Sequence, residues 1–200
     1  MFHLDSSASR QFSVVPPGKY FRRAAMWLEG RELQVRALRW DDRARLKAFL
    51  HRCSAASIRA RFFRPINEFS EALLNQLLVA DGQQHIALVV TQGNGDKEEI
   101  IAEGRAVAFQ DRPEVGDVAF LVQDDWQKRG IATWLLEELT EIACHNGFTH
   151  FTADVLVDNH AMLALIRKKG RPRTSNVSYG VIHYEIPIPC PETAGLMIVA

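Results

Sequence analysis

The segment from Val122 to Ala143, VQDDWQKRGIATWLLEELTEIA, joins the end of a strand to a helix through a basic turn that contains a glycine. After the turn, apolar residues recur at helical spacing at Ile131, Leu135 and Leu139. The first N–H groups of an α-helix have no partner within the helix, and the helix dipole places partial positive charge there. A strand, a turn and a helix in this order therefore predict a place where backbone amides bind a phosphate.

The sequence before this segment predicts one strand followed by helices. Apolar and polar residues alternate from Glu32 to Arg39, as in a half-buried strand. Stretches with apolar residues at helical spacing follow, and Gly82 ends the last of them. Short polar residues near the start of these stretches are the expected N-caps, namely Asp41 or Asp42, Ser57 and Ser70.

Alternation and turn residues then predict an antiparallel meander of three strands, at 85–92, 99–110 and 117–123. After the helix that ends near Ala143, a strand up to Val157, a helix with Asn159 at its N-cap and a last strand up to Ile188 complete the pattern. We therefore expect an α/β fold with a mixed, mostly antiparallel sheet of about six to seven strands and helices on both faces.

Composition points to one soluble globular domain without a nucleic-acid or membrane partner. The 200 residues are 47% hydrophobic, and 24 basic and 24 acidic residues give a formal net charge of zero. A balanced charge provides no basic field for nucleic acid or for an anionic membrane, so any anion site has to be local. The N-terminal segment lacks the features of a secretory signal, and no apolar run has the length of a membrane span.

The cysteines and histidines argue against a metal site and against a disulfide framework. Cys53, Cys144 and Cys190 are odd in number and show no Cys-x-x-Cys spacing, and the seven histidines are scattered. We therefore expect no metal and no disulfide framework, and a cytoplasmic location in which thiols stay reduced.

Two motifs resemble the GNAT acyltransferases. Gln127-x-x-Gly130-x-Ala132 is similar to the pyrophosphate loop of that family, (Gln/Arg)-x-x-Gly-x-(Gly/Ala), and it matches neither a Walker loop nor a Rossmann fingerprint. Residues 155–170, VLVDNHAMLALIRKKG, resemble a later segment of the family in which an asparagine begins a short helix that ends in lysine-glycine. Together with GDVAFLVQDDWQKRGIATWLL (116–136), these motifs look most like the catalytic domain of bacterial protein lysine acetyltransferases.

The resemblance implies a GNAT fold with a splayed pair of parallel strands, and acetyl-CoA as the co-substrate. It covers most of the chain, so we expect an N-terminal arm at 1–30, a GNAT acyltransferase domain at 31–190 and a C-terminal tail at 191–200. In this family the acyl donor lies where two parallel strands separate, which here follows the strand that ends at Val122.

The same resemblance assigns the acetyl-CoA contacts largely to backbone groups. Leu121 and Val122 are expected to pair with the pantetheine arm, and an amide there would polarise the thioester carbonyl. Asn159 is expected to bind the pantetheine or the nearby backbone, a role that is compatible with a simple helix cap. The amides expected to hold the pyrophosphate are those of Gln127, Lys128, Arg129, Gly130, Ile131, Ala132 and Thr133.

The catalytic residue implied by the resemblance is Asp117. Related lysine acetyltransferases place a glutamate at the start of this strand, where this sequence has Gly116 and Asp117, and Glu114 is the second candidate. A lysine amine with a pKa of about 10.4 is almost fully protonated at neutral pH, so a base has to remove a proton. A purely structural role for Asp117, as a strand-entry residue that binds local backbone, stays open.

We expect an N-acetyltransferase that moves the acetyl group to an amine by direct attack in a ternary complex, with a protein lysine as the preferred acceptor. Two departures from the family leave alternatives. Aspartate is one methylene shorter than glutamate, and Ile166 lies near the position of the tyrosine that often protonates the leaving thiolate. The alternatives are a catalytically weak regulatory module that binds acyl-CoA and a small-amine acetyltransferase. The apolar segments near both chain ends allow a homodimer.

Overall fold

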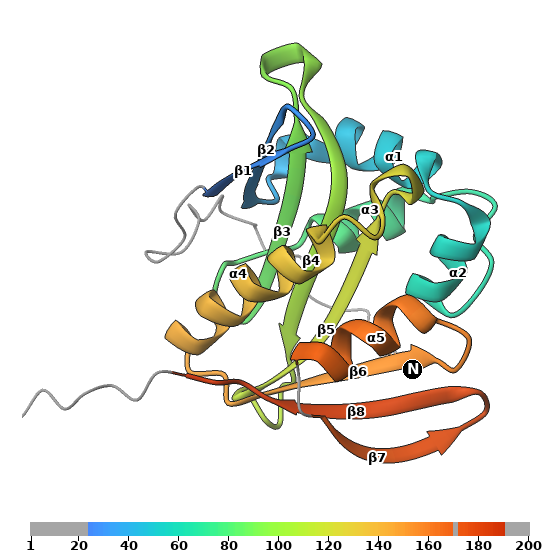
Figure 1. Ribbon diagram of the computed structural model, residues 1–200, viewed down its shortest axis with the longest axis vertical. Coiled ribbons are helices and arrows are strands. Elements are labelled where there is room, and N and C mark those ends of the chain that lie inside the picture. The colour runs from blue at the N-terminus through green and yellow to red at the C-terminus, as the bar shows by residue number, and fades with distance from the viewer. Residues whose placement is uncertain (1–23, 170–171, 191–200) are drawn as a thin grey trace, which may run out of the picture.

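One mixed sheet organises the part of the chain that the structure describes. The computed structural model describes residues 24–169 and 172–190, and its strands lie in the order β1-β2-β3-β4-β5-β6-β8-β7 (Figure 1). Neighbouring strands are antiparallel except β5 and β6, which run parallel. The strands are β1 (Ala24–Leu28), β2 (Arg31–Ala37), β3 (His85–Gln92), β4 (Glu99–Ala108), β5 (Val115–Val122), β6 (His150–Leu156), β7 (Arg173–Ser178) and β8 (Val181–Pro187). The expected α/β fold with a mixed, mostly antiparallel sheet is confirmed.

Two of the eight strands were not expected, and each belongs to a hairpin with a tight turn. β1 lies within residues 1–30, which the sequence assigned to an arm, and Glu29 and Gly30 turn the chain into β2 with positive φ at both residues. Tyr179 and Gly180 do the same between β7 and β8, so a stretch expected as one strand forms two. The remaining expected arm, 1–23, and the expected tail, 191–200, lie outside the described residues.

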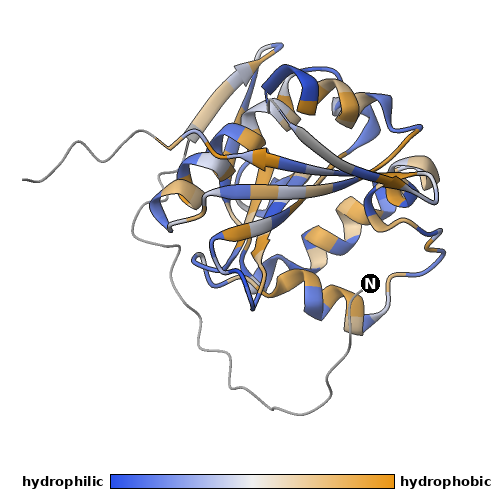
Figure 2. Ribbon diagram, turned by 90° about the horizontal axis from the view of Figure 1, so that it is seen from below, coloured by the Kyte–Doolittle hydropathy of each residue, from blue (hydrophilic) through white to orange (hydrophobic). Residues whose placement is uncertain are grey.

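Helices cover both faces of the sheet, and each face has its own apolar cluster. On one face α1, α2 and α3 pack over β3, β4 and β5, around residues such as Phe49 and Leu74. On the other face α4 and α5 pack around Leu135 and Phe151 (Figures 1 and 2). The helices are α1 (Arg43–Arg52), α2 (Ala55–Phe62), α3 (Glu71–Leu78), α4 (Ile131–His145) and α5 (His160–Lys169), with short 3₁₀ turns η1 (Trp40–Asp42), η2 (Gly95–Lys97) and η3 (Asp124–Trp126).

The helix caps follow the sequence prediction in part. Ser70 caps α3, because its side chain accepts a hydrogen bond from the Leu73 amide. The cap of α2 is Ser54 and not Ser57, whose own amide donates to the Ser54 hydroxyl. Asp42 stands at the N-cap position of α1 but makes no side-chain cap there. The sequence has two serines three residues apart in this segment. Ser54 is the cap because α2 begins directly after it, at Ala55.

The carboxylate of Asp42 instead belongs to a buried ion cluster with Arg36. The Arg36 guanidinium donates to both Asp42 oxygens, at 2.6 and 2.8 Å, and its Nε donates to Glu98 at 2.9 Å. The side chains of Arg36 and Asp42 are 3% and 1% exposed. Burial alone would lower the pKa of Arg36, but the bonds from Asp42 and Glu98 outweigh burial and raise it. This cluster therefore fixes β2 to η1 with every charge paired.

One disulfide contradicts the expectation drawn from the cysteines. Cys144, near the end of α4, is bonded to Cys190, which follows β8, and their Cα atoms are 5.5 Å apart. Cysteine spacing along the chain says nothing about two residues that the fold brings together from 46 positions apart. The cysteine content therefore gives no support to the expected cytoplasmic location. None of the helices in the described residues has the length and apolar character needed to span a bilayer.

Candidate functional site

The centre of the candidate site is the point where β5 and β6 separate. The two strands pair in parallel over three residues only, and the last register pair joins Asp117 to Thr152. Beyond this point β5 continues beside β4 up to Val122, while β6 continues beside β8 up to Leu156. The expected splayed parallel pair is therefore present, and each strand leaves one backbone edge toward the gap between them.

The backbone of β5 decides which residues face that gap. At the two ends of the strand, Gln123 N–H donates to the Ile101 carbonyl and Phe109 N–H donates to the Val115 carbonyl. Odd-numbered residues of β5 thus bond to β4, and even-numbered residues direct their N–H and C=O groups toward β6. Val122 and Phe120 thus direct their backbone groups toward the gap, whereas Leu121 bonds toward β4, and the pantetheine contacts stay a prediction.

The loop between β5 and α4 presents a run of backbone amides. Lys128 and Gly130 both adopt positive φ, at 60° and 88°, and α4 begins directly after them. The first helical hydrogen bond is from the Trp134 amide to the Gly130 carbonyl, and among the described residues no side chain caps this helix start. The amides of Lys128 to Thr133 therefore suit the predicted pyrophosphate contact, whereas the Gln127 amide already donates to the Asp124 carbonyl at 3.1 Å.

Side chains brace this loop against α2. The amide group of Gln127 donates to the Val122 carbonyl and to the Ser57 hydroxyl, both at 3.0 Å. The Asp124 carboxylate accepts hydrogen bonds from Ser57 and from the hydroxyl and backbone N–H of Ser54. Burial raises the pKa of Asp124, but these hydrogen bonds outweigh burial and lower it. Gln127 thus holds the loop through its side chain, and Ser57, expected as a helix cap, belongs to the same brace.

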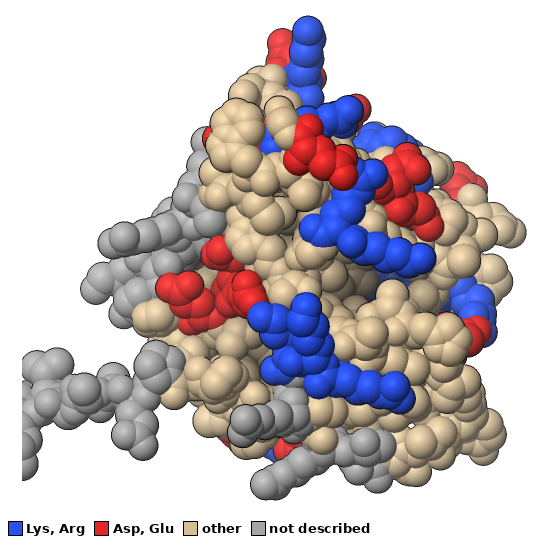
Figure 3. Space-filling view, viewed as in Figure 1, with Lys and Arg blue, Asp and Glu red and all other residues tan. Residues whose placement is uncertain are grey.

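Basic side chains flank the loop and the opposite wall of the gap. Figure 3 shows two groups of basic residues on either side of a hollow in the surface, over the start of α4 and over α5. The last turn of α5 supplies Arg167, Lys168 and Lys169, all exposed. On the loop, the Arg129 guanidinium lies 5.5 Å from the Trp126 ring centroid and forms an ion pair with Glu29. This local positive charge suits an anion, although the chain as a whole has a formal net charge of zero.

Asp117 lies at the apex of the gap in a mostly buried position on the α2 side of the sheet. The Thr152 hydroxyl donates to its Oδ1 at 3.3 Å. Burial raises the pKa of this carboxyl, and the negative charge of Asp154 adds to the rise. The Thr152 hydrogen bond and the positive charges of Arg61 and His183 oppose the rise without cancelling it. A carboxylate that holds its proton more tightly than usual is suited to accept one.

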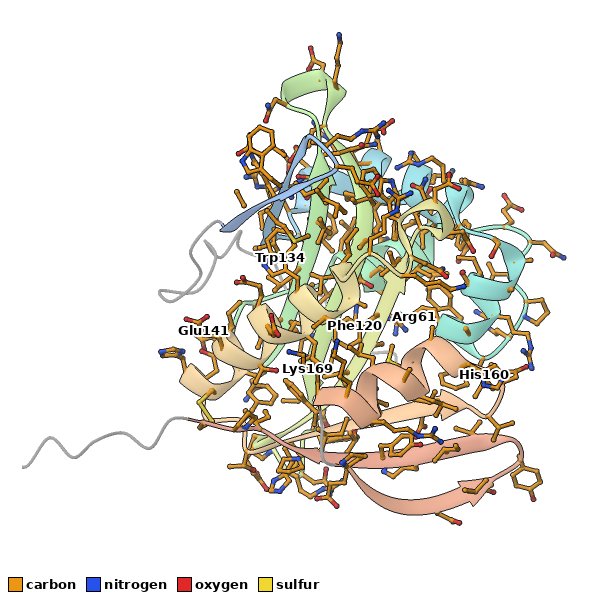
Figure 4. The ribbon with its side chains drawn as sticks, in the orientation of Figure 1. Arg61, Phe120, Trp134, Glu141, His160 and Lys169 are labelled. Atoms are coloured by element: carbon orange, nitrogen blue, oxygen red, sulfur yellow. A yellow bond between two sulfur atoms is a disulfide. The ribbon has the colours of Figure 1, made fainter. Side chains whose placement is uncertain are left out.

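Arg61, the neighbouring cation from α2, is incompletely paired. Its Nε is buried without a hydrogen-bond partner and lies 3.9 Å from Glu103, while Glu103 bonds Arg105 at 2.6 Å. Burial lowers the pKa of Arg61, and only the charges of Glu103 and Asp117 favour its cationic form. Arg61 extends from α2, on the face of the sheet that also carries Asp117 (Figure 4). Arg61 therefore does not face solvent, whereas Arg59 is exposed and pairs with Asp158 at 3.0 Å.

Three other expected residues have simpler surroundings. Asn159 caps α5, because its side chain accepts from the Met162 amide at 3.2 Å, and its contact to pantetheine stays a prediction. Glu114, the second candidate base, is exposed on the turn before β5, and its carbonyl accepts from the Thr149 amide. Ile166 is a buried core residue, 3% exposed. Within the described residues there is no group of histidine, cysteine or acidic side chains able to hold a metal.

Sequence reasoning missed the contacts that join distant segments. The brace between Ser54, Ser57 and Asp124 connects residues about seventy positions apart, and no local pattern marks it. The direction of the Phe120 backbone groups follows from the alternation along β5. One hydrogen bond between β4 and β5 is enough to fix which residues of β5 face the gap. Arg61 gave a weak signal, since an arginine among aromatic residues on a short helix is common on surfaces as well as in sites.

Known proteins match this chain in sequence and in fold. Residues 47–170 match the model of the acetyltransferase (GNAT) family. The chain is 33% identical over 141 residues to acetyltransferase PA5475 of Pseudomonas aeruginosa, covering 68% of this chain and 75% of that protein. It is 32% identical over 133 residues to acetyltransferase Pat of Mycolicibacterium smegmatis, which covers 66% of this chain but only 39% of Pat.

The solved structures agree. The GNAT domain of S. lividans PAT has a TM-score of 0.74 at 28% identity, covering 82% of this chain and 96% of that one. A cAMP-binding acyltransferase from Mycobacterium smegmatis has a TM-score of 0.56 at 27% identity, covering 84% of this chain and 48% of that one. Because the family match spans more than half of the sequence, the chain belongs to the acetyltransferase (GNAT) family and is an acetyl-CoA-dependent N-acetyltransferase.

Proposed function

We propose that this protein transfers an acetyl group from acetyl-CoA to the side-chain amine of a protein lysine, with Asp117 as the general base. The observation that carries the proposal is the position of Asp117, a mostly buried carboxyl at the last paired residue before β5 and β6 separate. Matches to Pat and to the PAT domain support a protein acceptor, since the sequence resembles that branch of the family.

The residues of the gap fit an extended thioester donor. The even-numbered backbone groups of β5, at Phe120 and Val122, are placed to pair with the amides of the pantetheine arm as a neighbouring strand would. The amides of Lys128 to Thr133 are placed to hold the pyrophosphate, with Lys128 and Arg129 adding charge. When bound there, acetyl-CoA supplies an activated acyl group.

The chemical step removes two protons from the acceptor nitrogen and gives it one acyl group. The Asp117 carboxylate takes a proton from the acceptor ammonium, directly or through a water molecule. The freed amine attacks the thioester carbonyl carbon, the new C–N bond forms, the C–S bond breaks, and the nitrogen releases its second proton to solvent. A β5 amide directed into the gap would stabilise the negative charge on the carbonyl oxygen during attack. The thiolate of CoA leaves and takes a proton from solvent, because Ile166 offers no acid.

The acceptor class is tested by labelling. The protein is incubated with isotopically labelled acetyl-CoA and a cell lysate separated into proteins and small molecules, and both fractions are analysed by mass spectrometry. We expect the label on lysine Nε atoms of proteins. Label found only on small amines would overturn the protein acceptor and favour a small-amine acetyltransferase.

A regulatory acyl-CoA-binding module is the second candidate, because one observation favours it. The base is an aspartate, shorter than the family's glutamate, and the position near the expected tyrosine is a buried isoleucine. Calorimetry separates the two functions. Tight binding of acetyl-CoA without label transfer to any fraction would favour the regulatory module.

A further inference from the structure

A row of polar residues crosses the sheet next to Asp117. Thr152 is its parallel partner on β6, and Asp154 lies two residues further along the same strand. His183 is the register partner of Asp154 on β8. Side chains two apart on a strand, or directly opposite on neighbouring strands, share one face of a sheet. Asp117, Thr152, Asp154 and His183 therefore face the same side.

The alternation of burial along β6 and β8 agrees with this placement. Phe151 and Val155 of β6 and Tyr184 of β8 are buried in the apolar cluster beneath α4 and α5. Asp154 and His183 lie on the opposite side, where their side chains are 53% and 44% exposed. The row thus begins at a mostly buried carboxyl and ends at groups in contact with solvent.

Asp154 and His183 form an ion pair within this row. The Nδ1 atom of His183 lies 2.5 Å from Oδ1 of Asp154. The pair carries one negative charge when the imidazole is neutral and no net charge when it is protonated.

We propose that Asp154 and His183 act as a positioning pair that sets the electric field at Asp117 from the far end of this polar row. The proposal deepens the proposed function, because it rests on Asp117 as the base. Neither residue touches the reacting atoms. They act through the electric field along the shared face of β5, β6 and β8.

The surroundings of Asp117 give the direction of each contribution. Burial raises the pKa of Asp117 most, and the charge of Asp154 raises it further. Thr152 lowers it through a hydrogen bond, and Arg61 from α2 and His183 from β8 lower it through their charges. Further charged residues on this face, among the side chains that the structure describes, include Arg36 of β2, Glu103 and Arg105 of β4, and Glu185 of β8.

Two single variants should shift the Asp117 titration in opposite directions. Asp154→Asn removes a negative charge, so the Asp117 midpoint should fall. His183→Asn removes a positive charge, so the midpoint should rise. The measurement is the ¹³C NMR titration of the Asp117 carboxyl, assigned by its loss in Asp117→Asn. The acid limb of the pH–rate profile should follow the same shifts.

Matched control variants and a rescue variant distinguish a specific effect on the Asp117 titration midpoint from a general effect on the fold. Glu141→Gln and His145→Asn remove the same kinds of group from the end of α4, away from the gap, and should leave the midpoint unchanged (Figure 4). Asp154→Glu should restore a midpoint near that of the wild type.

The positioning pair would be overturned if the Asp117 titration midpoint moved in the same direction in both variants. It would also be overturned if neither variant moved the midpoint more than the control variants do. Because the NMR titration needs no turnover, a wild-type protein without transferase activity would remove the proposed function while this result still decides the pair.

Discussion

Two arginine–aspartate groups lie on the same helix-covered face of the sheet, and they are built differently. Arg36 donates two hydrogen bonds to the Asp42 carboxylate, and Glu98 accepts a third from the Nε of Arg36. Arg61 lies near Asp117 without a hydrogen bond to it, and its Nε has no partner. Both groups are largely removed from water.

The difference separates stability from reactivity. A buried charge whose every donor and acceptor is satisfied is locked in one ionisation state, and removing its partner is costly. A buried carboxyl with a single hydrogen bond and an incompletely paired cation nearby keeps a pKa that its surroundings can move. In this protein, buried charge therefore indicates a candidate functional site only where the charged groups are incompletely hydrogen-bonded.

The largest expected effect is on catalysis by Asp117→Asn. Loss of a general base lowers the turnover rate by about 10²–10⁴-fold. The pKa of Asp117 is raised, so its ionised form destabilises the fold once pH exceeds the unfolded pKa, and asparagine removes that cost at pH 7. We therefore expect a variant that is inactive and at least as stable, measured by thiol release and urea denaturation. A comparable rate loss in Glu114→Gln, with Asp117→Asn still active, would move the base to Glu114.

Asp42→Asn should break the fully paired group. Removing one charge of a buried pair leaves Arg36 partly uncompensated and costs about 3–5 kcal/mol of unfolding free energy. Urea denaturation measures the loss, and Arg43→Gln is the control, because its bridge to Glu71 is exposed and contributes below about 1 kcal/mol. An Asp42→Asn loss as small as the control would mean that complete pairing carries no special stability.

Asp124→Asn tests pairing without deep burial. Its hydrogen bonds from Ser54 and Ser57 lower the pKa of Asp124, so its stabilisation is present above the unfolded pKa and is lost as pH falls through the folded value. After allowance for solvent screening, we expect a loss of about 1 kcal/mol at pH 7 that begins to shrink below roughly pH 3.9 and disappears below the folded pKa. Denaturation at both pH values checks this, and a loss that persists in acid would contradict the assignment.

Arg61→Met should have the smallest effect on stability. The variant removes a buried cation whose Nε has no partner, while Glu103 keeps Arg105, so unfolding free energy should change by less than about 1 kcal/mol. The pKa of Asp117 should rise further, because a favourable positive charge is lost. NMR titration of the Asp117 carboxyl tests this, and an unchanged midpoint would separate Arg61 from the site.

Local signals in the sequence were sufficient for the fold and the loop but not for the ion clusters. The turn at Gly130 and the helix after it follow from residues within one short segment, and the splayed strands followed from resemblance. By contrast, the bonds from Arg36 to Glu98 and from Ser54 to Asp124 join residues more than sixty positions apart. Such contacts depend on packing of whole elements, which residue patterns along the chain do not encode directly.

The left-handed backbone at Lys128 has a consequence for how this protein can be altered. A side chain in that conformation is disfavoured by about 1–2 kcal/mol, and glycine would be free of this strain. Glycine at position 128 would therefore relieve the backbone strain, whereas lysine keeps the positive charge beside the loop. A directed-evolution library selected for thermal stability should enrich glycine at position 128. A library selected for activity at a low acetyl-CoA concentration should keep lysine there.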